Sequence, residues 1–281
     1  MKKIGFIDLF IDEWHANNYP KWFAEAPSGK DFTVAAAWEK APAGGRPLAQ
    51  WCEEMQIPAA KSLEALLEEC DCFCVLAPSN AEVHEELSAL PLATGKPVYI
   101  DKPFAPDRAA AERIFAAADR SGSPLWSSSA LRFGDEWQAA LQSADAPEYV
   151  GTTGGGRLFS EYCIHQVEMI VQAMGTSVAR VLRTSHNGVD HAILEFEDGR
   201  TASLTLQMKI PFSATICRQS GEVVSIPTMS NTFLNLIEAM LQFFQTGISP
   251  VDRSQTIAIA GVIDALIRAE KTLGSWVNVL R

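Results

Sequence analysis

Apolar residues in the first half of the chain occur in short runs that are separated by amphipathic stretches. The runs predict buried strands over residues 3–8, 32–39, 71–77, 97–100 and 125–126. The stretches between them predict helices over residues 20–26, 47–55, 62–69, 81–89 and 106–121. Pro91 is expected to break the fourth of these helices. Strands that alternate with helices indicate a parallel sheet with helices on both faces, and ligands bind such sheets outside the carboxyl ends of the strands.

The second half of the chain has the pattern of an antiparallel sheet. Asn187-Gly188 and Asp198-Gly199 separate predicted strands over 178–185, 189–196 and 201–208, and Ser220-Gly221 indicates one more turn. Alternating apolar residues would face the core of this half, and the polar residues between them would face water or a partner subunit. Two helices, over 232–245 and 254–273, complete the chain. The fold class is therefore α/β, with a parallel sheet in residues 1–122 and an α+β domain on a largely antiparallel open sheet in residues 123–281.

Composition narrows the class of protein. The chain has 281 residues, 47% of them hydrophobic and 20% charged, with a net charge of −11. The negative charge argues against nucleic acid and anionic membranes as partners. No apolar run approaches the ~18 residues of a membrane span, and no signal peptide is expected. Six cysteines without paired spacing favour a reducing compartment. We therefore expect a cytoplasmic protein.

A charged pair, Asp101-Lys102, follows the fourth predicted strand and precedes Pro103. That position is at the ligand-binding edge of a parallel sheet. A buried lysine can act as an acid or a base, because burial lowers its pKa from ~10.4 towards ~7–8. The alternative interpretation is an exposed loop lysine that pairs with its neighbour.

A second candidate group is Glu161, His165 and Glu168, which would share one face of a helix. A carboxylate beside a histidine fixes its tautomer and stabilises the imidazolium. Two carboxylates and one histidine are a weak metal signal, so no metal is expected. The alternative interpretation is a solvated helical face.

The remaining candidates favour structural roles. Cys70, Cys72 and Cys74 alternate along a strand and are expected to be small buried residues rather than zinc ligands. His15 and His84 lie near predicted strand ends, where a lone histidine is more often structural. His186 and His191 flank a turn and are expected on the surface. The tryptophans of the first half are expected in the core or in a cleft wall: Trp14, Trp22, Trp38 and Trp51.

Three stretches resemble the glucose–fructose oxidoreductase/inositol dehydrogenase (Gfo/Idh/MocA) family. Ala77-Pro-Ser-Asn80 through His84 is similar to the Thr-Pro-Asn…His segment of the family. Gly95-Lys-Pro-Val-Tyr-Ile-Asp-Lys-Pro103 is similar to its Gly-Lys-His-Val…Glu-Lys-Pro motif. Gly154-Gly-Gly followed by Glu161-x-Cys-x-His-x-x-Glu168 is similar to its Gly-Gly-Gly…Asp-x-Gly-x-His-x-x-Asp motif. Arg132-Phe133 falls where the family often has Arg-Phe.

The resemblance implies a Rossmann domain that binds NAD or NADP, and hydride transfer to or from a sugar, polyol or related carbonyl compound. It also implies a homodimer or higher homo-oligomer through the C-terminal sheet. Lys102 and His165 would be the acid–base pair, with Glu161 in place of the family's aspartate, and Arg132 would join these three in binding substrate. Asp101 would lie near the nicotinamide ribose, and Glu39 near the adenosine ribose, which favours NAD over NADP. The implied cofactor-binding positions are Asp8, Phe10, Glu39, Pro78, Asn80, Asp101 and Lys102.

The turn after the first strand departs from the family pattern. No glycine occurs between Ile7 and Ser28, where the family has a glycine-rich loop, and Asp8, Asp12 and Glu13 stand there with no evident basic residue to balance them. Without glycine the backbone cannot approach a diphosphate closely. Each carboxylate at 5–6 Å would also cost about 3 kcal/mol at an effective dielectric of about 20.

Three hypotheses follow. The leading one is an NAD(P)-dependent oxidoreductase of the Gfo/Idh/MocA type. The alternative is a redox-inactive sugar-binding or regulatory relative, which the acidic first turn favours. A third is a lyase or hydrolase in which the same acids bind a metal ion.

Overall fold

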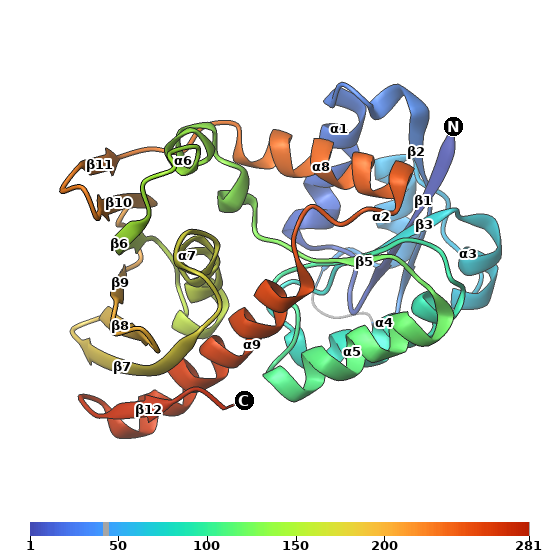
Figure 1. Cartoon of the computed structure of the whole chain (residues 1–281). Helices are drawn as coiled ribbons and strands as arrows, with labels where there is room; N and C mark the ends of the chain where they lie inside the picture. Colours follow the sequence, from blue (N-terminus) through green and yellow to red (C-terminus); the bar gives the residue numbers. More distant parts are fainter. Residues whose placement is uncertain (42–44, 281) are drawn as a thin grey trace. The chain divides into compact units, whose positions relative to one another are not determined.

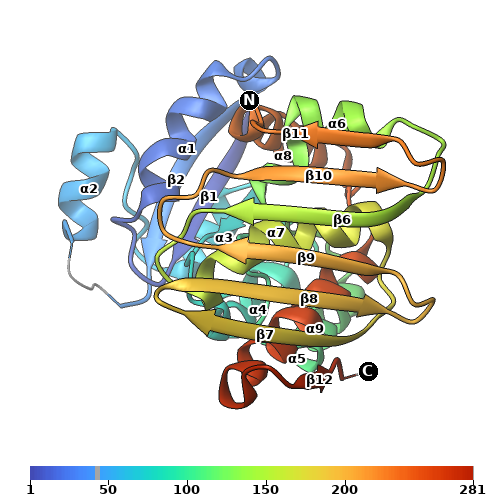
Figure 2. The same cartoon turned by 90° about the vertical axis from the view of Figure 1, so that its left-hand side faces the viewer.

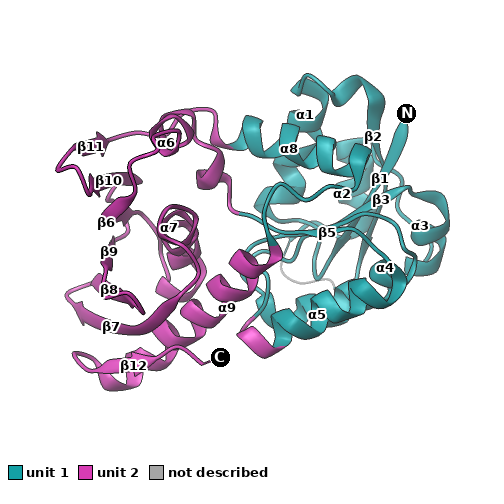
Figure 3. Ribbon diagram, in the orientation of Figure 1, with its two compact units in different colours: residues 1–105, 110–128, 233–252 teal, residues 106–109, 129–232, 253–281 magenta. Residues whose placement is uncertain are grey.

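The computed structural model of the chain describes residues 1–41 and 45–280. The chain divides into two compact units (Figure 3). Unit 1 holds residues 1–105, 110–128 and 233–252, and unit 2 holds residues 106–109, 129–232 and 253–281. The predicted ranges 1–122 and 123–281 differ from these units mainly because residues 233–252 cluster with unit 1.

Unit 1 is built on a parallel sheet with the strand order β2-β1-β3-β4-β5 (Figure 1). The buried apolar runs form these strands, so the predicted strands are confirmed. Their bounds are Lys2–Asp8 (β1), Phe32–Glu39 (β2), Cys72–Val75 (β3), Val98–Ile100 (β4) and Leu125–Trp126 (β5).

Helices flank both sides of this sheet (Figure 1). They are α1 (Trp14–Glu25), α2 (Leu48–Met55), α3 (Leu63–Glu69), α4 (His84–Ala93), α5 (Arg108–Ser121) and α8 (Thr232–Thr246), with short 3₁₀ turns at Gly29–Asp31 and Ala81–Val83. The predicted start at Pro20 is wrong, because α1 begins six residues earlier and Pro20 lies inside it. The predicted break at Pro91 is also wrong. Burial of Leu87 and Leu92 holds the last turn of α4 together in spite of the proline.

Unit 2 is built on a mostly antiparallel sheet with the order β11-β10-β6-β9-β8-β7-β12, which Figure 2 shows face on. Among the described strands of this sheet, β6 and β9 form the one parallel pair. The predicted meander is confirmed, and both residues of its first turn, Asn187 and Gly188, have positive φ as a primed hairpin turn requires. The bounds are Pro147–Gly154 (β6), Val178–His186 (β7), Val189–Phe196 (β8), Thr201–Leu206 (β9), Ser213–Arg218 (β10), Val223–Ile226 (β11) and Trp276–Asn278 (β12).

One face of this sheet carries the core of unit 2. Residues at alternate positions of β8 and β9, such as Leu194 and Leu204, are buried as predicted, whereas Met208 is 62% exposed because β9 ends at Leu206. Helices α7 (Phe159–Met174) and α9 (Arg253–Arg268) pack on this face. Unit 2 also contains α6 (Asp135–Leu141) and 3₁₀ turns at Ala130–Phe133 and Ala269–Thr272.

No helix in the described part of the chain is long and apolar enough to cross a membrane.

Candidate functional site

The carboxyl ends of the unit 1 strands bring several predicted residues to one edge of the sheet. Asp8 pairs in register with Glu39 at the ends of β1 and β2. The Asp101 amide, one residue beyond β4, donates to the Val75 carbonyl at the end of β3. This is the edge where ligands bind to open parallel sheets.

Asp101 is 1% exposed and holds its two carboxylate oxygens in different surroundings. Oδ1 accepts a hydrogen bond of 3.4 Å from the Tyr19 hydroxyl, and the Tyr99 hydroxyl, which donates to the Ser128 carbonyl at 2.9 Å, lies 3.4 Å from the same oxygen. Oδ2 has no hydrogen-bond partner among the described residues and lies 3.7 Å from Lys102 Nζ. The Lys102 side chain is only 11% exposed, so it is not the exposed loop lysine of the alternative interpretation.

The Tyr19 hydroxyl stays protonated in this environment. Burial, and then the Asp101 carboxylate, raise the pKa of Tyr19 well above its usual value. Tyr19 therefore remains a hydrogen-bond donor to Asp101 over the whole physiological range.

Asp8 at the end of β1 is fully buried. Its Oδ1 accepts hydrogen bonds from the amides of Leu9 (2.7 Å) and Ala77 (3.0 Å), and Oδ2 has no hydrogen-bond partner in the part of the chain that the structure describes. Burial, followed by the nearby Glu13 carboxylate, raises the pKa of Asp8 well above its usual value, although backbone hydrogen bonds, including one from Phe10, oppose this.

Glu13 holds the amino end of α1. Its carboxylate accepts hydrogen bonds from the backbone amides of His15 (2.7 Å) and Ala16 (2.5 Å), and a 3.1 Å contact joins it to His15 Nδ1. Free amides at this helix end are what holds a diphosphate in a Rossmann domain. In this chain the Glu13 carboxylate accepts from these amides and so occupies the place that the diphosphate would take.

The other acids of the first turn are also engaged. Glu39 accepts hydrogen bonds from the amides of Ile11 (3.0 Å) and Leu48 (3.2 Å). Arg46 is the basic residue that the sequence did not reveal: its Nη2 lies 2.7 Å from Asp12 Oδ1. Hydrogen bonds from Arg46 lower the pKa of Asp12, so this acid is neutralised by its partner.

The residues of the first turn do not fit a dinucleotide diphosphate while Glu13 stays on α1. The amides of Leu9, Phe10, Ile11, His15 and Ala16 all donate to carboxylates of the chain itself. At the other end of the sheet edge, the buried Oδ2 of Asp101 lies 3.7 Å from both His15 Nε2 and Lys102 Nζ.

Pro78 and Asn80 lie in the segment that follows β3. The backbone there is strained, since Ala77 (φ 43°) and Ser79 (φ 67°) both adopt positive φ without being glycine. His84 supports this segment, because its Nε2 lies 2.9 Å from the Leu76 carbonyl and its Nδ1 lies 3.1 Å from the Phe104 carbonyl. His84 is therefore structural.

In unit 2, helix α7 carries the second group of predicted residues. Glu161, in the first turn, and His165 are partly exposed, whereas Glu168 is 2% exposed. The His165 Nδ1 lies 2.6 Å from Ser129 Oγ, and the Ser129 amide donates to Glu168. The solvated helical face of the alternative interpretation therefore does not describe Glu168.

Arg132 forms a buried ion pair with Glu168. Its Nε lies 2.6 Å from Glu168 Oε1, and both side chains are at least 96% buried. A charge at this depth needs its partner, so Arg132 and Glu168 stabilise each other and position Ser129 beside His165.

The glycines before α7 are required by close packing. A Cβ on Gly155 would lie 2.9 Å from the Ile210 carbonyl oxygen, and one on Gly156 would lie 2.3 Å from the Tyr162 ring. This part of the motif is therefore explained by the fold of unit 2 itself.

The other candidates have structural environments. Cys70, Cys72 and Cys74 are buried free thiols, and burial raises the pKa of Cys70 to about 12. His186 and His191 are exposed as predicted. Residues 1–41 and 45–280 contain no group of three histidine, cysteine or acidic side chains that could hold a metal ion.

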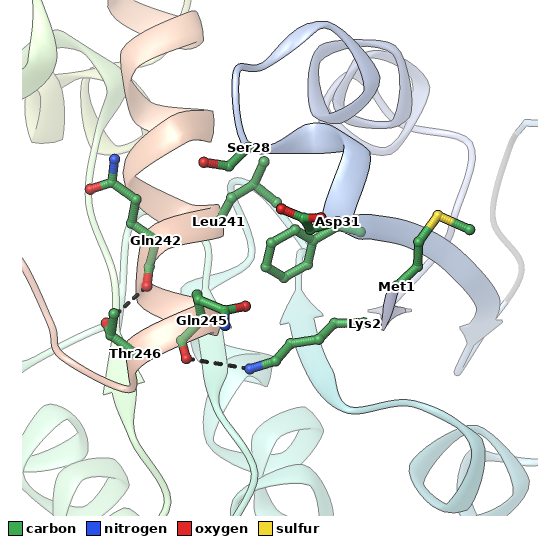
Figure 4. A pocket seen from close by; sticks show the side chains of 9 residues that line it. Met1, Lys2, Ser28, Asp31, Leu241, Gln242, Gln245 and Thr246 are labelled. Carbon is green, nitrogen blue, oxygen red and sulfur yellow. Dashed lines mark hydrogen bonds between the residues drawn. The ribbon is translucent and has the colours of Figure 1, made fainter.

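A pocket of about 720 Å³ in unit 1 lies away from these residues (Figure 4). It is formed where the first residues of β1 and β2 meet the last turns of α8, and Lys2 Nζ donates there to the Gln245 carbonyl at 3.4 Å. This is the amino end of the sheet, whereas ligands bind at the carboxyl end. The lining residues are Met1, Lys2, Ser28, Asp31, Phe32, Leu241, Gln242, Gln245 and Thr246.

Sequence reasoning missed Glu13, His15 and Tyr19 as parts of one cluster with Asp101. The reason is the misplaced start of α1. With the helix starting at Trp14, Glu13 is the N-cap residue, and His15 and Tyr19 are four residues apart on one face of the helix.

Comparisons with known proteins agree with this architecture. The model of the "Oxidoreductase family, NAD-binding Rossmann fold" (Gfo/Idh/MocA) matches residues 13–129. Scyllo-inositol dehydrogenase from Lactobacillus casei, solved with bound cofactor NAD(H) and scyllo-inositol, has a TM-score of 0.81 at 16% identity, with 99% of each chain covered. A probable dehydrogenase from Thermotoga maritima has a TM-score of 0.80 at 14% identity, covering 99% of this chain and 98% of that one.

An oxidoreductase from Agrobacterium radiobacter, in complex with NAD⁺, L-tartaric acid and magnesium, has a TM-score of 0.76 at 14% identity, covering 99% of this chain and 98% of that one. At such identities these structures establish the fold. Together with the family match they confirm the resemblance to the Gfo/Idh/MocA family that the motifs indicate.

Proposed function

We propose that the protein is a cytoplasmic NAD(P)-dependent oxidoreductase that transfers hydride to or from a sugar, polyol or related carbonyl compound. The observation that carries the proposal is the buried Asp101–Lys102 pair at the carboxyl edge of the unit 1 sheet. The family match over residues 13–129 supports it, and the six free cysteines agree with a reducing compartment.

In this proposal Lys102 Nζ exchanges a proton with the reacting hydroxyl of the substrate. Asp101, held by Tyr19 and Tyr99, orients the lysine from 3.7 Å. His165 is the second acid–base group, with Ser129 on its Nδ1, and Glu161 keeps the substrate-binding role that the resemblance implies, whereas Arg132 is buried in its ion pair with Glu168 and supports the site from behind. The nicotinamide ring would supply the hydride acceptor or donor. The Glu13 carboxylate must release the backbone amides of His15 and Ala16 before the diphosphate can bind there.

The experiment is a turnover assay with inositols, other polyols and aldoses, using NAD⁺ and NADP⁺ and following the absorbance of the reduced nicotinamide. We expect Lys102→Met to lower kcat by about 10²–10⁴-fold, the usual contribution of a general acid or base. Lys40→Met is the matched control, because Lys40 is an exposed lysine of unit 1 that forms an ion pair with Glu86, and it should retain full activity. Equal losses in the two variants would contradict the role of Lys102.

A second function, a redox-inactive sugar-binding or regulatory relative, is favoured by a different observation. Asp8, Glu13 and Glu39 already engage the first-turn amides. If this function is correct, millimolar nicotinamide dinucleotides will not bind, whereas a polyol will still protect the protein against thermal unfolding.

The proposal includes a homodimer through the open face of the unit 2 sheet. Its support is the alternation along β8 and β9, which leaves one side of this sheet without a covering layer of unit 2 (Figure 2).

A further inference from the structure

Four side chains of unit 1 form a row of alternating acidic and basic groups. Glu13 Oε2 lies 3.1 Å from His15 Nδ1, His15 Nε2 lies 3.7 Å from Asp101 Oδ2, and the same oxygen lies 3.7 Å from Lys102 Nζ. The four side chains are between 1% and 11% exposed, so water screens them little.

His15 therefore has a carboxylate at each ring nitrogen. Glu13 accepts from the Nδ1–H, which fixes the tautomer and leaves Nε2 directed at Asp101. Without a proton between them, Nε2 and Oδ2 would be two facing acceptors. A proton that reaches Oδ2 therefore has an acceptor in Nε2, and the imidazolium that results donates to both carboxylates.

The other groups around the row determine which oxygen of Asp101 can exchange a proton with His15 and Lys102. The Tyr19 hydroxyl donates to Oδ1 and the Tyr99 hydroxyl lies 3.4 Å from it, whereas Oδ2 faces His15 and Lys102. The rings of Tyr19 and Trp14 pack edge-on against the imidazole. Asp8 is the further acid near Glu13. Within the described residues, His15 thus connects to the lysine through Asp101 Oδ2.

We propose that His15 is a positioning and proton-relay residue for Lys102, acting through Asp101, a role that rests on the function proposed above for Lys102. When Lys102 takes a proton from a substrate hydroxyl, the ammonium passes one proton to Asp101 Oδ2. Asp101 passes that proton to Nε2 of neutral His15, which becomes an imidazolium held by Glu13. Lys102 returns to the amine, Asp101 returns to the carboxylate, and the charge is stored on His15. The two gaps of 3.7 Å need to close by less than 1 Å, as catalytic hydrogen bonds often do when substrate binds.

The test measures the reactivity of Lys102 rather than turnover. The protein is pulse-labelled with acetic anhydride between pH 5.5 and 9.5, and acetylation of Lys102 is measured by mass spectrometry relative to Lys21, an exposed lysine of α1. The relay predicts a Lys102/Lys21 ratio with a second inflection in the range where histidine titrates. It also predicts that His15→Gln removes that inflection and changes the ratio at least threefold. A single inflection in the pH dependence of the wild-type Lys102/Lys21 ratio would overturn the proposal. This result comes from the wild-type protein alone and does not depend on a variant that folds.

Two substitutions distinguish proton transfer through His15 from a purely structural role of its side chain. The amide of His15→Gln can still reach Asp101 and that of His15→Asn can still reach Glu13, but neither can carry a proton between them. If support alone mattered, His15→Gln would keep the wild-type ratio and pH profile, which would contradict a relay. His191→Gln, at an exposed histidine of unit 2, is the matched control and should change nothing.

Failure of the relay can be distinguished from failure of the proposed oxidoreductase function. A protein with no nicotinamide-dependent turnover but with a His15-dependent Lys102 profile would contradict the oxidoreductase and keep the relay. In an active enzyme, the relay further predicts that His15→Gln lowers kcat about 10-fold or more with little change in KM.

Discussion

Burial of the Asp8 carboxyl group makes the stability of the protein depend on pH. A carboxyl group with no exposed surface costs free energy when it is charged, and Asp8 keeps one oxygen without a partner. Because its pKa is raised well above the usual value, the folded protein binds the Asp8 proton more tightly than the unfolded chain does. The stability that this proton contributes is fully present below about pH 4, the ordinary range of an aspartate, and is lost as pH rises through the raised pKa of the folded state.

The first prediction concerns Asp8→Asn. The asparagine oxygen can still accept from the Leu9 and Ala77 amides, and no charge has to be buried. We expect the variant to unfold with a free energy about 1 kcal/mol higher than wild type at pH 7, and with no gain near pH 4. Urea denaturation at the two pH values measures this. If Asp8→Asn raised the free energy of unfolding by the same amount at pH 7 and near pH 4, Asp8 would not titrate as described. Asp12→Asn is the contrasting control, since Asp12 is paired with Arg46 and should lose stability near neutral pH.

At the scale of the element, helix α1 decides how the first turn is interpreted. Pro20 suggested a helix start, because proline suits a first turn. In the structure Pro20 lies inside a twelve-residue helix whose N-cap is Glu13. Packing of Tyr19 and Phe23 into the core of unit 1 outweighs the cost of the proline. A glutamate is not a preferred N-cap residue, so propensity alone did not reveal it.

The strands and the hairpins were easier to predict than the helix ends. The runs in β1 to β5 and the Asn187-Gly188 turn have strong local signals, and these elements were confirmed. Strand β6 was missed, because Gly151 and its neighbours Thr152 and Thr153 lack the apolar pattern of a strand. It forms because β9 and β10 supply hydrogen-bonding partners on both sides, which is information held far away in the sequence.

At the scale of the whole molecule, the sequence indicated two sheets but not how the chain is shared between them. Helix α8 follows the last antiparallel strands along the chain, yet it packs with unit 1, where Met240 and Phe243 contact Cys74 and Trp126. A periodic apolar helix gives no local sign of which core it will join. The same limit applies to the Glu13–His15–Asp101 cluster, because its members are separated by more than eighty residues.

The proposed homodimer gives a prediction at this scale. Ile193 lies in β8 on the open face of the unit 2 sheet and is 39% exposed. A charge in a sheet-to-sheet interface would have to be desolvated, so Ile193→Asp should convert the dimer to a monomer and halve the mass measured by light scattering. Leu273→Asp, at an exposed leucine outside any strand, should leave the mass unchanged. A monomeric wild-type protein would contradict the proposed dimer directly.

In the proposed function, a nicotinamide dinucleotide binds to unit 1 in competition with Glu13. The most direct measurement is a titration of ligand-free protein with NADH and NADPH, in which energy transfer from tryptophan reports binding. Trp14, which is 51% exposed beside Glu13, is suited to this. Glu13→Ser keeps a good N-cap residue on α1 and removes the competing charge, and Glu25→Ser removes an acid from the other end of the same helix. We predict millimolar dissociation constants for wild type and for Glu25→Ser, and a value at least tenfold lower for Glu13→Ser. Equal affinity in all three proteins would refute the competition, and binding in none of them would contradict the oxidoreductase itself.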